Sequence, residues 1–149
     1  MGRPAGLYVS ADIDSPLADV RMDIQDISYE DDTFDAIVCS HVLEHIIDDG
    51  KAMRELYRVL KPGGIAILQV PYSPLLQESF EDPTVTEQGE RLRAFGQTDH
   101  VRIYGLDYPD RLRAAGFFVE AVLPSAFLSE PEMRHYALDP AEPIFFCKK

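Results

Sequence analysis

Two neighbouring stretches decide the fold: TFDAIVCSHVLEHI, residues 33–46, and LKPGGIAILQV, residues 60–70. The first contains an apolar run at 36–39, as expected for a strand at 33–40 buried on both faces of a parallel sheet. Between the two stretches, apolar residues recur at helical spacing from Asp48 or Asp49 to Leu60, and the Pro62-Gly63 pair ends the helix. A strand at 65–70 follows. Strand, helix and strand in this order predict a right-handed crossover in an α/β fold.

Further elements are predicted on both sides. They are a β-rich run at 7–13 (LYVSADI), a short element at 20–24, a helix at 108–115 closed by Gly116, and strands at 117–123 and 144–147. The last two strands follow each other closely, so we expect them to pair antiparallel at the end of the sheet. Residues 71–100 are polar and rich in turn residues, which is typical of an insertion or lid loop within a single domain spanning 1–149.

Composition excludes several classes of protein. The chain has 149 residues, 46% of them hydrophobic, which suits one domain with its own core. A net charge of −12 argues against a nucleic-acid partner. The absence of an apolar run long enough for a membrane span, and of a secretory signal, predicts no membrane partner and a cytoplasmic location. Cys39 and Cys147 lie in apolar runs without a CxxC pattern and are expected in the core.

Three motifs occur in a recognisable order: FDAIVCSHVLEHI, then LKPGGIAILQVP, then DHVRIYGLDYPDRLRAAGFFVE at 99–120. This order resembles the small-molecule, type 11-like branch of the class I S-adenosylmethionine-dependent methyltransferases, from about Leu7 to Lys149. The resemblance implies a Rossmann-like, mostly parallel sheet with an antiparallel C-terminal strand. It also implies S-adenosylmethionine as cofactor and methyl transfer to a small-molecule acceptor.

The resemblance assigns cofactor contacts to acidic residues that follow the first strands. Asp12, at the end of the run 7–13, corresponds to the residue that holds the ribose hydroxyls, with Asp14 as the alternative. A carboxylate suits this task because it accepts two hydroxyl hydrogen bonds. Asp23 corresponds to the residue that meets the adenine amino group, and the amide of Ile24 to the one that meets a ring nitrogen. Asp26 is the alternative to Asp23.

Ser40 and His41 follow the strand at 33–40, at the sheet edge where ligands of open α/β sheets bind. The resemblance implies that both line the methionine end of the cofactor. His41 is also a candidate general base, because imidazole titrates near pH ~6.5. His100 is a second candidate for substrate contact or proton transfer; the alternative is a loop histidine that braces the insertion.

The segment 41–45 also spells H-x-x-E-H, a pattern of some zinc peptidases. Two histidines four residues apart on a helix face the same way. However, the pattern directly follows a buried strand, and the sequence shows no clear third ligand, which a catalytic zinc requires. We therefore expect no metal at His41 and His45. A nicotinamide cofactor is disfavoured because no G-x-G-x-x-G motif precedes the first strand.

The family's usual first strand and glycine-rich loop have no counterpart, since only MGRPAG precedes Leu7. We therefore expect an N-terminally truncated domain that binds S-adenosylmethionine weakly. The sheet would close by pairing 7–13 with 33–40, or by recruiting a second copy into a homodimer through its exposed edges. The competing hypothesis is a non-catalytic remnant that acts as a binding or self-associating module.

Overall fold

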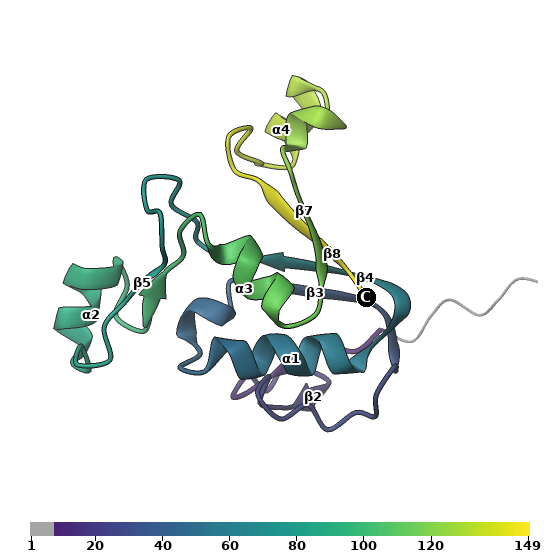
Figure 1. Ribbon diagram of the computed structural model, residues 1–149, viewed down its shortest axis with the longest axis horizontal. Coiled ribbons are helices and arrows are strands. Elements are labelled where there is room, and N and C mark those ends of the chain that lie inside the picture. Colours follow the sequence, from purple (N-terminus) through teal and green to yellow (C-terminus); the bar gives the residue numbers. More distant parts are fainter. Residues whose placement is uncertain (1–7) are drawn as a thin grey trace, which may run out of the picture.

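The computed structural model describes residues 8–149, so Leu7 and the preceding MGRPAG lie outside the described residues. Its main feature is a four-stranded sheet in the order β3 (Phe34–Ser40), β4 (Leu60–Gln69), β8 (Ile144–Lys148) and β7 (Phe118–Val122) (Figure 1). β3 and β4 are parallel, and β8 is antiparallel to both β4 and β7. The Rossmann-like sheet with one antiparallel C-terminal strand is therefore confirmed. The expected antiparallel pairing of the last two strands is also confirmed, with β8 between β4 and β7 and β7 at the end of the sheet.

Helix α1 (Asp49–Val59) connects β3 to β4 as predicted, and Asp48 caps it by accepting a 2.8 Å hydrogen bond from the Lys51 amide. Its apolar face is buried in the core, and the contributing residues are Ala52, Met53, Leu56 and Val59. β4 begins at Leu60 rather than at 65, because Leu60 already pairs with Phe34.

The N-terminal elements form a separate sheet, in which β1 (Ala11–Asp12) and β2 (Val20–Arg21) pair parallel. The expected closure of 7–13 onto 33–40 is wrong: within residues 8–149, β3 pairs with β4 alone. β1 is short because the Asp12 side chain turns the chain, accepting hydrogen bonds from the amides of Asp14 (2.8 Å) and Ser15 (2.7 Å). Within residues 8–149, β3 consequently stands at the end of the four-stranded sheet, and Val38 on this strand is 74% exposed.

Of the remaining segments, the strands β5 (Phe80–Glu81) and β6 (Arg102–Ile103) pair antiparallel, with α2 (Gln88–Phe95) between them in sequence. α3 (Tyr108–Ala114) precedes β7, and η2 (Pro124–Ala126) and α4 (Glu130–His135) follow it. β5 and α2 lie on the left and α4 at the top of the view in Figure 1, and α3 lies against the sheet. The predicted Gly116 stop has φ +116°, and a Cβ there would lie 2.9 Å from the Tyr57 ring. Within the described chain, no helix is long and apolar enough to cross a membrane.

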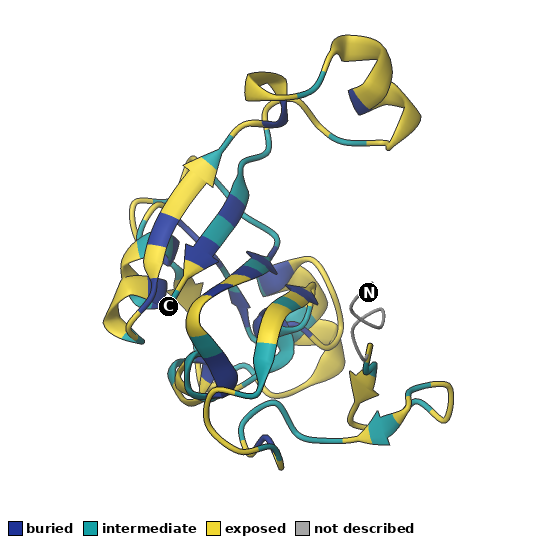
Figure 2. Cartoon of the chain, turned by 90° about the vertical axis from the view of Figure 1, so that its right-hand side faces the viewer, coloured by how far each residue is buried: buried dark blue, intermediate teal, exposed yellow. Residues whose placement is uncertain are grey.

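Burial follows from this arrangement. The core lies between α1, α3 and one face of the four-stranded sheet, and includes both predicted core cysteines (Figure 2). Burial raises the pKa of each thiol to about 12, so Cys39 and Cys147 are protonated at neutral pH. Ser40 and His41, two of the predicted site residues, lie at the carboxyl end of β3 and are exposed.

Candidate functional site

The chain leaves β3 through an unusual backbone conformation at His41. Ser40 is the last residue of the strand, and His41 has φ +55°, in the left-handed region that side chains other than glycine rarely occupy. The His41 amide is held by a 2.9 Å hydrogen bond to the Gln69 carbonyl at the end of β4. The chain then enters the one-turn helix η1 (Leu43–His45). Strain of this kind is retained where surrounding contacts enforce it, often at functional sites.

Arg102 enforces this turn from β6. Its side chain is 2% exposed, and its guanidinium donates hydrogen bonds to the carbonyls of Leu43 (3.0 Å), Ile46 and Ile47 (2.9 Å). It also pairs with Glu81 at 2.9 Å. The Leu43 carbonyl also accepts hydrogen bonds from the Ile46 amide (3.2 Å) and the Tyr104 hydroxyl (3.3 Å). The carbonyls of Ile46 and Ile47 follow η1, and Arg102 supplies them with donors. A residue distant in sequence therefore fixes the H-x-x-E-H segment.

Asp49, at the start of α1, binds two further side chains in the same region. Its buried carboxylate accepts 2.8 Å hydrogen bonds from the Tyr104 hydroxyl and from Nη2 of Arg111. Burial, followed by the charge of Asp49, raises the pKa of Tyr104 well above its ordinary value, so the hydroxyl stays protonated as a donor. Asp49, Tyr104 and Arg111 thus join α1, α3 and the segment after β6.

The turn brings Glu44, His45 and His100 together. One ligand atom from each lies within 4.8 Å of the others. The Glu44 side chain is 1% exposed, yet neither of its carboxylate oxygens has a hydrogen-bond partner among the described residues. His41 Nδ1 lies 3.3 Å from Glu44 Oε1 but does not reach hydrogen-bond geometry. Sequence analysis missed this cluster, because it treated His100 apart from the H-x-x-E-H segment.

His100 is 4% exposed, and its ring meets that of His45 edge to face with 4.7 Å between centroids. Burial lowers the pKa of His100, and the neighbouring His45 lowers it further. The imidazole is therefore neutral at physiological pH and carries a lone pair on one nitrogen. The His100 side chain therefore lies buried in the cluster, and its predicted contact with substrate stays a prediction.

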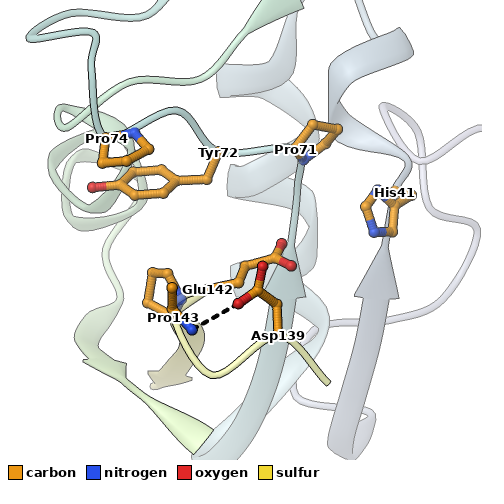
Figure 3. Close-up of a pocket in the computed structure, with 8 residues that line it drawn as sticks. His41, Pro71, Tyr72, Pro74, Asp139, Glu142 and Pro143 are labelled. Atoms are coloured by element: carbon orange, nitrogen blue, oxygen red, sulfur yellow. Dashed lines mark hydrogen bonds between the residues drawn. The ribbon is translucent and has the colours of Figure 1, made fainter. Parts of the chain in front are cut away.

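A pocket of about 490 Å³ opens beside His41, at the carboxyl ends of β3 and β4 (Figure 3). Its other walls come from the turn after β4 and from the loop before β8, and they consist of Pro71, Tyr72, Pro74, Asp139, Ala141, Glu142 and Pro143. Gln69 holds the second loop in place by donating hydrogen bonds to Glu142 and to the Pro143 carbonyl, both at 3.1 Å. The volume is in the range of small-molecule sites.

The predicted adenosine contacts follow β1 and β2. Asp12 ends β1, and two backbone amides hold the pKa of its carboxyl below the usual value. Asp23 is partly buried and accepts a 2.8 Å hydrogen bond from the Gln25 amide, and Ile24 packs against the core. Asp14 and Asp26, the alternatives, are exposed.

Comparisons with known proteins agree with this architecture. Residues 8–68 match the family described as methyltransferase domain. The chain is 35% identical over 65 residues to a demethylmenaquinone methyltransferase of Clavibacter sepedonicus, covering 42% of this chain and 26% of that protein. It is 36% identical over 78 residues to the uncharacterized methyltransferase YcgJ of Bacillus subtilis, covering 52% and 28%.

A solved S-adenosylmethionine-dependent methyltransferase from Mesorhizobium loti shares the fold, with a TM-score of 0.54, 17% identity, and coverage of 87% of this chain and 68% of that one. The chain therefore shares the fold of class I methyltransferases. The sequence matches confirm the predicted resemblance to the S-adenosylmethionine-dependent members of that class, whose cofactor is S-adenosylmethionine. The chain spans about a quarter of the length of the curated relatives named above.

Proposed function

We propose that this chain contributes to methyl transfer from S-adenosylmethionine to a small-molecule acceptor. In this proposal Asp12 holds the ribose, Asp23 and the Ile24 amide hold the adenine, and Ser40 and His41 line the methionine end. Small-molecule acceptors are supported by relatives such as the demethylmenaquinone methyltransferase. The acceptor itself is assigned only to this broad class.

The observation that carries the proposal is the pocket beside His41. Methyl transfer requires the acceptor nucleophile, methyl carbon and sulfur in line, with water excluded. The pocket opens where the strained His41 backbone leaves β3, at the sheet edge where α/β folds bind ligands. The His41 side chain is 58% exposed and available to remove a proton from the acceptor. Residues 71–100, between β4 and β6, are proposed as the lid.

Asp12→Ala should weaken binding of S-adenosylhomocysteine by about 1.5–3 kcal/mol, or about 10–150-fold, the usual contribution of hydrogen bonds to a charged group. Titration calorimetry measures the change. Because Asp12 also holds the turn at 14–15, Asp12→Asn provides a control that keeps an oxygen for the turn but removes the charge. It should recover part of the affinity.

Asp14→Ala is the matched control, since Asp14 is exposed and pairs with Arg21 through a 3.2 Å surface contact. It should leave the affinity nearly unchanged. A loss of affinity confined to Asp14→Ala would show that Asp14, and not Asp12, holds the ribose. Equal losses of affinity for both variants would show that Asp12 has no specific role in binding.

A second candidate function, self-association, is favoured by the position of β3, which ends the four-stranded sheet within residues 8–149. Val38 lies on this strand and is 74% exposed. An exposed apolar edge strand recruits another strand, and a second copy offers the same edge. We propose that two copies pair along β3, so Val38→Lys should shift the sedimentation profile towards monomer.

Leu75→Lys is the control for this experiment. Leu75 is 89% exposed but lies in the turn after β4, and the change alters net charge by the same amount. Sedimentation velocity over a range of concentrations compares the variants. The proposed pairing along β3 would be contradicted if the wild-type chain stayed monomeric at every concentration. It would also be contradicted if Leu75→Lys shifted the sedimentation profile towards monomer as much as Val38→Lys.

A further inference from the structure

The unexplained feature of the molecule is the buried carboxylate of Glu44. It is 1% exposed and has no hydrogen-bond partner among residues 8–149. Burying an ionised carboxylate without compensation is costly, so buried charges normally pair or bind metals. The hydrogen-bonding groups around it, including Arg102 and Tyr104, are directed at backbone carbonyls or other carboxylates.

The side chains that do face Glu44 are histidines, which are good metal ligands. His45 Nε2 lies 4.0 Å from Glu44 Oε1, and His100 brings a nitrogen into the same 4.8 Å cluster. A tetrahedral ion with bonds of 2.0–2.2 Å separates its ligands by about 3.3–3.6 Å. Small rotations of the imidazoles and the carboxylate bridge this difference. The cluster therefore holds the third ligand that the H-x-x-E-H pattern alone lacks.

Asp99 supplies a second, independent indication that the cluster is a metal site. Its Oδ2 lies 3.3 Å from Nδ1 of His45, on the ring nitrogen that does not face Glu44. A carboxylate on the far nitrogen of a histidine is the arrangement that orients metal ligands and makes them more basic. His45 thus has one nitrogen directed at a carboxylate partner and the other directed into the cluster.

We propose that Glu44, His45 and His100 bind one divalent transition-metal ion, with His41 adjacent. Two imidazoles and a carboxylate suit Zn²⁺ and neighbouring first-row ions rather than Mg²⁺ or Ca²⁺, which prefer oxygen ligands. This proposal differs from the sequence-based expectation of no metal at His41 and His45, which rested on the preceding buried strand and on the lack of a clear third ligand. Provided that the proposed methyl transfer holds, the ion selects acceptors that carry an oxygen ligand such as a hydroxyl group.

Zinc titration of the tag-free chain tests the proposal without S-adenosylmethionine, so its outcome is independent of the proposed function. We expect saturable binding at one site. Asp99→Asn changes a residue that only contacts a ligand, so it should weaken zinc binding by about 10–100-fold. Glu44→Gln and His100→Gln each remove a ligand and should weaken zinc binding by more than that. His135→Gln is the matched control, because His135 lies in α4 outside the cluster.

Glu44→Gln also separates a binding role from a structural one. It keeps the shape of the side chain and removes the buried charge, so the metal-free variant should be at least as stable as the wild type. Zinc should raise the melting temperature of the wild type but not of this variant. A wild-type chain that shows no saturable zinc binding overturns the proposal. Binding that persists unchanged in His100→Gln overturns it as well.

Discussion

Replacing Arg102 by methionine should lower the free energy of unfolding by about 3–5 kcal/mol, the cost of removing one partner of a buried ion pair. The change removes the guanidinium donors to the carbonyls of Leu43, Ile46 and Ile47, of which only Leu43 keeps other donors within residues 8–149. It also removes the 2.9 Å partner of Glu81. Urea denaturation at neutral pH measures the loss. The H-x-x-E-H segment would also lose the contacts that hold its turn.

Two controls sharpen this experiment. Arg102→Lys keeps the positive charge but not the planar fork, so it should recover only part of the stability. Arg113→Met removes a 52% exposed arginine whose pair with Asp110 lies on the surface, and should change stability by about 0.5 kcal/mol or less. A loss below about 1 kcal/mol for Arg102→Met would show that the clamp on η1 is dispensable.

Asp49→Ala should also lower the free energy of unfolding by about 3–5 kcal/mol, because it too removes one partner of a buried ion pair. The carboxylate is buried and accepts from Tyr104 and Arg111, with Arg102 Nε a further 3.8 Å contact. Its removal takes away the charged acceptor of both groups, which among the described residues leaves the Tyr104 hydroxyl only its 3.3 Å contact to the Leu43 carbonyl and Arg111 only its 3.0 Å pair with Glu81. Thermal and urea unfolding measure the change, and Asp48→Ala, which removes only the cap of α1, should cost about 1 kcal/mol.

A double-mutant cycle separates the ion pair from general packing. If Asp49 and Arg111 stabilise the fold together, Asp49→Ala combined with Arg111→Ala should cost clearly less than the sum of the single changes. Strict additivity would contradict the coupling inferred from the 2.8 Å contacts.

The central elements of the fold could be predicted because their signals are local. The apolar run at 36–39, the helical spacing up to Leu60 and the Gly116 stop each depend on neighbouring residues, and β3, α1 and α3 follow from them. The N-terminal pairing was predicted wrongly, because two-residue strands leave little pattern in sequence. β5 and α2 were missed because the strand pairing of β5 depends on β6, many residues later.

The candidate site was also predictable only in part, because some of its contacts join residues that are distant in sequence. His41 and Ser40 follow a recognisable strand, and the structure places them at its carboxyl end. The meeting of His100 with Glu44 depends on the Arg102 clamp, a long-range contact that no local pattern indicates. Glu44 itself looks like an ordinary helix-start residue in sequence, and only its burial without a partner marks it as unusual.

The central claim, that the segments after β1, β2 and β3 form one cofactor site, is tested most directly by an amide NMR titration with S-adenosylhomocysteine. Carried to millimolar concentration, the titration also detects weak binding. We predict that the shift changes concentrate at Asp12, at Asp23 and Ile24, and at Ser40 and His41, and saturate along one common curve. Changes confined to other surfaces, or no saturable change at all, would contradict the account.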